Sequence, residues 1–198
     1  MNTIYNGIRA VLGLGKPQSD CSRKYELDNL KWEISIPENF QEVTAEQWSS
    51  ITEKGEQAIE KSSAEPIGSR PEILFVYKAD DANFLEASWR PYDVVLEGNY
   101  KDACARECQT LLQAFKTELP QARVESAATE VMVSGLDFQL FNLSAIYPNG
   151  MTVNSLMYYR LCGDFELLIN LMYVNPEYGW QMLQMLNASA FETVEMLV

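Results

Sequence analysis

The chain has 198 residues, of which 47% are hydrophobic and 22% charged, as in an ordinary soluble domain. Its formal net charge is -13, which argues against binding nucleic acid or an anionic membrane through a broad basic face. It contains no histidine, which excludes Ser–His and Cys–His nucleophile activation and histidine-ligated zinc.

The N-terminal segment predicts a cytoplasmic protein. Residues 1–27 read as a short helix followed by a linker, and residues 28–198 read as a single domain. The short helix either docks on that domain or tethers a partner. The segment resembles no secretory signal, and no apolar window is long enough to span a membrane.

The first strand of the domain is predicted over Leu30–Ile36, where apolar and polar residues alternate. Pro37 ends the strand because proline removes a ladder donor. Thr44 and Gln47 have capping-box spacing, which predicts a helix that begins there and ends near Lys61.

The middle of the chain predicts two strands and a long helix. The apolar run over 72–79 indicates a central strand covered on both faces, and 83–93 alternates until Pro91. A helix is predicted from about Tyr100 to Glu118, with Pro120 beyond its end.

The C-terminal half predicts an antiparallel meander followed by a helix. A strand over 129–135 ends at Gly135, and three more strands follow over 136–147, 151–161 and 165–174. Asn149-Gly150 and Gly163-Asp164 are tight-turn signals between them. The last helix is predicted over 176–187.

These elements resemble the PsbP/Mog1-like fold, which includes DcrB-type bacterial proteins. The similarity rests on "WEISIPENF" at 32–40, "VMVSGLDFQLF" at 131–141 and "SAF" at 189–191, and covers 28–191. It implies an α+β fold, with an antiparallel β-sheet of about six strands packed between helices as an α/β/α sandwich. Proteins of this group are mostly non-enzymatic binding modules, and some are chaperones of secreted effectors.

The cysteines give a weak metal signal. Cys104 and Cys108 lie four apart on one helix face, and Cys162 can supply a third ligand. The same two helical positions also continue the apolar stripe of that helix, so core packing is the favoured interpretation. No metal or cofactor is expected.

Paired carboxylates are the second chemical candidate. Asp80, Asp81 and Glu86 can do acid–base work or hold a cation, but "KADDANF" reads as a polar turn with solvated charge. No catalytic residue is assigned.

Two stretches are candidates for partner binding. Trp89, Arg90 and Tyr92 are residue types that concentrate in protein–protein hot spots. Tyr158 and Arg160 share one face of a strand and can line a surface if that face is uncovered. For both stretches, structural packing is the competing interpretation.

The sequence therefore favours a non-catalytic protein-binding module, such as an adaptor or chaperone-like factor. The alternative is a small-molecule-binding domain or a histidine-independent carboxylate enzyme. A pocket on which Asp80, Asp81, Glu86, Tyr158 and Arg160 converge would favour that alternative.

Overall fold

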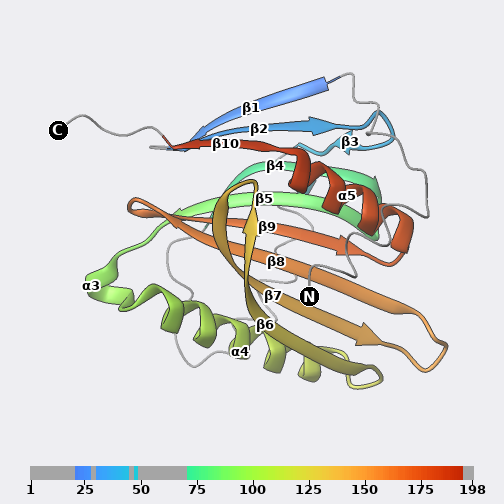
Figure 1. The fold of residues 1–198 in the computed structure, drawn as a ribbon. Coiled ribbons are helices and arrows are strands. Elements are labelled where there is room, and N and C mark those ends of the chain that lie inside the picture. The colour runs from blue at the N-terminus through green and yellow to red at the C-terminus, as the bar shows by residue number, and fades with distance from the viewer. Residues whose placement is uncertain (1–20, 28–29, 45–46, 49–70, 194–198) are drawn as a thin grey trace.

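The computed structural model describes residues 21–27, 30–44, 47–48 and 71–193. In these residues, two antiparallel sheets and three helices build a layered α+β fold (Figure 1). The larger sheet has seven strands in the order β3-β4-β5-β9-β8-β7-β6, and the smaller has three in the order β1-β2-β10. No helix in these ranges is long and apolar enough to cross a membrane.

The seven-stranded sheet consists mostly of hairpins between neighbours in the chain. Its strands are β3 (Gln41–Glu42), β4 (Glu72–Asp80), β5 (Asn83–Pro91), β6 (Arg123–Val133), β7 (Leu136–Ile146), β8 (Thr152–Cys162) and β9 (Phe165–Tyr173). Gly150 turns β7 into β8 at φ 86°, and Gly163 turns β8 into β9 at φ 61°. Both glycines adopt the left-handed conformation that these hairpin turns need, which confirms the predicted meander.

Pro37 marks the point where the chain leaves the small sheet for the large one. β2 (Leu30–Ile36) stops directly before it, and the amide of Phe40 donates to the Pro37 carbonyl at 3.0 Å. The chain then enters β3, whose Glu42 pairs with Tyr77 of β4. The strand end was therefore predicted correctly, and the short strand β3, which was not predicted, precedes the expected helix start at Thr44.

The predicted helix start at Thr44 is present as a capping box. The Gln47 amide donates to Thr44 Oγ1 and the Thr44 amide donates to Gln47 Oε1, both at 3.3 Å. The remainder of that predicted helix, and the predicted helix near the N-terminus, lie outside the described residues.

The three described helices begin at side-chain caps. In α4 (Tyr100–Glu118), Asn99 accepts from the Lys101 amide, and in α5 (Pro176–Ala188), Asn175 accepts from the Glu177 amide. The third helix, α3 (Val94–Glu97), is a single turn. α4 confirms the long helix predicted in the middle of the chain, and α5 confirms the last helix.

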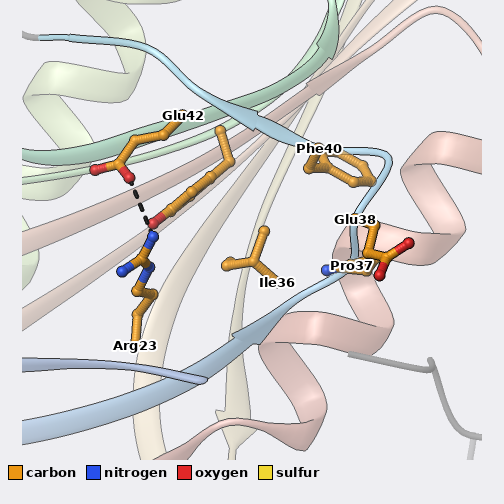
Figure 2. Close-up of a pocket in the computed structure, with 7 residues that line it drawn as sticks. Arg23, Ile36, Pro37, Glu38, Phe40 and Glu42 are labelled. Carbon is orange, nitrogen blue, oxygen red and sulfur yellow. Dashed lines mark hydrogen bonds and ion pairs between the residues drawn. The ribbon is translucent and has the colours of Figure 1, made fainter. Parts of the chain in front are cut away.

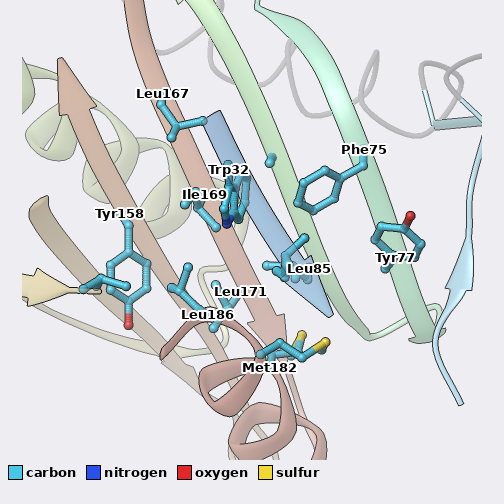
Figure 3. Close-up of a cluster of buried hydrophobic side chains, with 14 of the residues drawn as sticks. Trp32, Phe75, Tyr77, Leu85, Tyr158, Leu167, Ile169, Leu171, Met182 and Leu186 are labelled. Carbon is cyan, nitrogen blue, oxygen red and sulfur yellow. The ribbon is translucent and has the colours of Figure 1, made fainter. Parts of the chain in front are cut away.

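The faces of the large sheet bury separate cores. One face packs against α5 and the small sheet, and the core between them includes Trp32 of β2, Ile169 of β9 and Met182 of α5 (Figure 3). The opposite face packs against α4, where Cys104 and Cys108 contact a cluster that includes Tyr159. Burial on both faces explains the continuous hydrophobic run of β4, where Phe75 and Tyr77 belong to one core and Val76 to a cluster on the other face.

Three expectations about the fold are corrected. There are more than six strands, and one face of the large sheet is covered by a second sheet as well as a helix. Cys21–Leu27 is no linker: it forms β1, which pairs antiparallel along β2, and β10 (Ala190–Thr193) pairs with the other edge of β2. Strand β6 begins at Arg123, six residues before the predicted 129.

Candidate functional site

The single turn α3 is the most exposed apolar feature among the described residues. Val94, Val95 and Leu96 are 63%, 86% and 83% exposed, and no residue of this helix is buried. They lie between the end of β5 and the start of α4, at the margin of the large sheet (Figure 1). Three consecutive exposed apolar side chains mark an interaction site more often than an ordinary loop.

The backbone of α3 is fixed by its own termini. Asp93 Oδ1 accepts hydrogen bonds from the amides of Val95 (2.8 Å) and Leu96 (3.3 Å), as an N-cap does. Glu97 Oε1 accepts from the Asp93 amide at 3.2 Å, and Gly98 closes the turn at φ 83°. The turn therefore has a defined shape.

Two further side chains tie α3 to the body of the domain. Tyr92 is 5% exposed, and its hydroxyl donates to the Gly98 carbonyl at 2.9 Å. Arg106 of α4 donates to the Glu97 carbonyl at 2.7 Å. The Tyr92 amide also donates to the Asp164 carbonyl in the β8–β9 turn, which anchors the same loop to the sheet.

Arg90 lies beneath α3 among three carboxylates from three elements. Its Nη1 is 2.7 Å from Glu97 Oε2 of α3, its Nε is 2.8 Å from Glu166 Oε1 of β9, and its Nη2 is 4.0 Å from Glu107 Oε2 of α4. Glu166 is almost fully buried, with a side chain 4% exposed. The planar guanidinium can donate to several carboxylates at once, so this cluster joins α3, α4 and β9.

The cluster holds three carboxylates and one guanidinium, and the pKa values of two of its buried acids are raised. Burial raises the pKa of Glu107 to about 7, the negative charge of Glu166 adds to the rise, and Arg90 opposes it. Burial also raises the pKa of Glu166, against the influence of Arg90. Because Arg90 already occupies the centre, the cluster serves to hold α3 in place. In the described residues no group of histidine, cysteine and acidic side chains has metal-site geometry.

Glu107 predicts a specific pH dependence of stability. Its pKa in the folded chain is above the ordinary value, so between about pH 4.5 and 7 the native state binds more protons than the unfolded state. The contribution of Glu107 to the free energy of unfolding is therefore fully present below about pH 4.5 and is lost as the pH rises through about 7. We expect Glu107→Gln to reduce the fall in the free energy of unfolding between pH 5 and 8.

Urea titrations at several pH values measure this effect. Glu118→Gln, which changes an exposed acid on the same helix, is the matched control and should leave the pH profile unchanged. If Glu107→Gln shows the same fall as the unchanged protein, Glu107 does not titrate in that range.

The structure separates the five predicted partner-binding residues. Arg90 and Tyr92 meet beneath α3, on the α4 side of the sheet. Trp89 points to the opposite face, where its ring lies 4.5 Å from that of Phe165. Tyr158 is 6% exposed in the core beside α5, and Arg160 donates to the Asp137 carbonyl at 2.6 Å. Tyr158 is therefore covered by the core beside α5, whereas Arg160 is only half-buried on the same face.

The two helical cysteines pack in the core, as the favoured interpretation predicted. Cys104 and Cys108 are 4% and 8% exposed, and burial raises their pKa values to about 11 and 12. Both are therefore neutral thiols at physiological pH. Cys162 packs against the cluster on the other side of the sheet, so it does not join them.

The carboxylates that the sequence grouped together are dispersed. Asp80 accepts from the Ala82 amide within the β4–β5 turn, and Asp81 pairs with Lys78 in solvent, so these two are turn charges as predicted. Glu86 is different. It lies within the sheet and accepts from the indole of Trp48 at 3.1 Å, and burial raises its pKa.

A small pocket lies between the end of β2 and strands β3 and β4 (Figure 2). Its volume is about 140 Å³, and Arg23 and Glu42 form a 3.5 Å ion pair beside it. It is lined by Arg23, Ile36, Pro37, Glu38, Phe40, Glu42 and Tyr77. Pockets for drug-sized ligands are usually several hundred Å³, and none of the residues expected to converge on a ligand lines this one.

Sequence reasoning missed α3 itself. Asp93 and Gly98 are an N-cap residue type and a C-terminal glycine five positions apart, which together signal one helical turn. The exposure of the three apolar residues between them had no comparable signal, because apolar residues are usually predicted to be buried.

Comparison with known proteins identifies the fold. No protein-family model and no curated protein match the chain. The solution structure of cyanobacterial PsbP (CyanoP) from Synechocystis sp. PCC 6803 is similar, with a TM-score of 0.51 at 10% identity, over 93% of this chain and 99% of that one. The chain therefore has the PsbP-like fold that the sequence predicted.

Two other solved structures are more distantly similar. PA94, a Pseudomonas aeruginosa protein of unknown function, has a TM-score of 0.41 at 11% identity, over 84% of this chain and 94% of its own. LpqN, involved in cell envelope biogenesis of Mycobacterium tuberculosis, has a TM-score of 0.35 at 14% identity, over 86% and 90%.

Proposed function

We propose that this PsbP-like chain is a non-catalytic binding module, of adaptor or chaperone-like type, that recognises a protein partner through α3. The observation that carries the proposal is the exposure of Val94, Val95 and Leu96 on a turn that several hydrogen bonds hold in one shape. We place the module in the cytoplasm, where the buried thiols of Cys104 and Cys108 stay reduced.

The fixed shape of α3 favours binding for an energetic reason. A flexible apolar loop loses conformational entropy when a partner immobilises it, and this loss weakens the complex. Asp93, Tyr92, Arg90 and Arg106 already hold α3 in the free protein. Arg90 and Tyr92 then act as positioning residues beneath the contact surface.

The charges around α3 indicate the kind of partner. Asp93, Asp102 and Asp164 are exposed near the turn, and the whole chain has a net charge of -13. The two exposed bases beside it already have partners, Lys101 in Glu130 and Arg106 in the Glu97 carbonyl. An apolar recess with a basic rim would complement this arrangement in both hydrophobicity and charge.

The double variant Val95→Ser/Leu96→Ser tests the proposal. Both side chains are more than four-fifths exposed, so we expect the free energy of unfolding of the variant to stay within about 0.5 kcal/mol of that of the unchanged protein. Hot-spot residues contribute about 2 kcal/mol or more, so partner affinity should fall at least about thirtyfold. Urea denaturation measures the stability of the variant. Quantitative affinity purification of tagged protein from its own cells, followed by titration of the recovered partner, measures the affinity.

Met151→Ser is the matched control, because Met151 is 40% exposed in the β7–β8 turn, at the opposite end of β8 from the β8–β9 turn that contacts Tyr92. A partner that binds the unchanged protein and the control, but not the double variant, supports the proposal. Equal recovery with all three proteins contradicts a role for α3. If native mass spectrometry finds a bound small molecule and no protein co-purifies, the small-molecule alternative replaces the proposal.

A further inference from the structure

Strand β6 forms a long edge of the seven-stranded sheet. It stands last in the strand order and pairs only with β7 among the described residues (Figure 1). The pairing runs without a bulge from Arg123 opposite Ile146 to Val133 opposite Leu136. Along its other side, the outward backbone N–H and C=O groups of β6 have no strand partner in the described part of the chain.

The other end of the same sheet is built differently. There β4 is partly covered by β3, and its pairing with β5 contains two register shifts, one between Ile73 and Phe75 and one between Lys78 and Asp80. Short covering strands and bulges are devices that keep edges from pairing with other chains. Within the described residues no strand covers β6, and its pairing with β7 has no bulge, so β6 lacks both devices. It also contains no proline.

The centre of β6 is also free of charge. Residues 126–129 are four consecutive small, uncharged and exposed residues, Ser-Ala-Ala-Thr. The nearest charges already have internal partners: Arg123 pairs with Glu125, and Glu130 pairs with Lys101 of α4. Both pairs are more than half exposed, and exposed ion pairs contribute little, so Glu125 and Glu130 stay accessible to basic side chains of an incoming strand.

We infer that β6 is a docking edge for an extended segment of another protein, which adds to the large sheet as an eighth strand. This surface is separate from α3 and does not depend on the function proposed for α3. Main-chain hydrogen bonds along the edge supply affinity, and side chains at alternate positions supply specificity.

A second copy of this chain is a poor occupant of the edge. Antiparallel pairing of β6 with itself places residues of the same sheet face opposite each other, and Arg123 and Glu130 lie on opposite faces. A register centred on Ala127 sets Glu125 opposite Thr129 and Glu130 opposite Val124. No opposite charges meet, and each copy carries a net charge of -13.

The two acids of β6 define the segment that fits. Glu125 and Glu130 are five positions apart, so they lie on opposite faces near the two ends of the neutral centre. A complementary segment has two basic residues five positions apart with small or β-branched residues between them. Cross-strand pairs of opposite charge and β-branched residues are the stabilising combinations in antiparallel sheets.

Two synthetic peptides of about twelve residues, long enough to cover the edge, test the inference. One carries two lysines five positions apart in a threonine and valine background, and the other carries glutamates in their place. Hydrogen–deuterium exchange of the full chain with each peptide gives both location and affinity. We expect the lysine peptide to slow exchange in 123–133, and the glutamate peptide to bind at least about tenfold more weakly.

Ala127→Pro and Ala128→Pro identify the interacting backbone. Successive amides of a strand point to opposite sides, so one of these prolines breaks the pairing with β7 and the other removes an outward donor. The variant that unfolds at the same temperature as the unchanged protein should lose peptide binding at least about tenfold. Val95→Ser/Leu96→Ser should bind the peptide normally, which separates this edge from α3.

Three results would overturn the inference. The first is no slowing of exchange in β6 at about millimolar peptide, a concentration that detects even weak strand addition. The second is equal binding of the two peptides, and the third is full binding by a folded proline variant.

Discussion

Replacing Arg90 by leucine should lower the free energy of unfolding by about 3–5 kcal/mol, the usual cost of leaving one member of a buried ion pair without its partner. The Glu166 side chain is 4% exposed and its Oε1 lies 2.8 Å from Arg90 Nε. Leucine fills part of the space but leaves this carboxylate without a counter-charge. Equilibrium denaturation in urea at pH 7 and above measures the loss.

The double variant Arg90→Leu/Glu166→Leu is the control. It removes both charges, so we expect it to recover most of the stability, because apolar pairs often replace buried ion pairs at little cost. Burial already raises the pKa of Glu166 against the influence of Arg90. In Arg90→Leu that pKa should rise further, so protonation makes the defect smaller at pH 5 than at pH 8. A double variant no more stable than the single one would contradict this explanation.

Replacing Trp32 by alanine should cost about 3–5 kcal/mol, the range observed when a large aromatic side chain is removed from a core. Trp32 is 1% exposed, and its ring lies 5.1 Å from that of Phe75 and 5.3 Å from that of Phe191. These contacts join β2 of the small sheet to β4 of the large sheet and to β10. The same denaturation measurement applies.

Lys31→Ala provides the comparison for Trp32. Lys31 is the preceding residue on β2 and points to solvent, where its ion pair with Glu26 is exposed. We expect a change within about 0.5 kcal/mol, because exposed ion pairs contribute little. A loss below about 1 kcal/mol for Trp32→Ala would mean that the contact between the sheets is not part of the cooperative core.

The sequence predicted the elements whose signals lie within a few residues. Pro37 ends β2 because proline supplies no amide for the ladder, and Thr44 and Gln47 bond to each other across three residues. Gly150 and Gly163 turn the meander because only glycine adopts their conformation at low cost. Cys104 and Cys108 were predicted to be buried from helical spacing alone, and they are.

The sequence did not predict which distant segments lie side by side. β5 pairs with β9, which follows it by more than 70 residues. β1, early in the chain, and β10, late in the chain, pair with the two edges of β2. In β1 the alternation of apolar and polar residues is weak, so its sequence reads as a linker. It becomes a strand through its pairing with β2. Pairing at such separations depends on the packing of the whole chain, which no local pattern contains.

Tertiary structure likewise decided the candidate sites. Arg90 was selected as a residue for partner contact, but Glu166, 76 residues further along the chain, holds it beneath the surface. Val94, Val95 and Leu96 read as ordinary apolar residues, and they are exposed because Asp93, Tyr92 and Arg90 fix the turn that carries them. Local hydrogen bonds and backbone preferences act within a turn or strand and are readable from sequence. Exposure depends on what the rest of the chain covers, which only the folded arrangement determines.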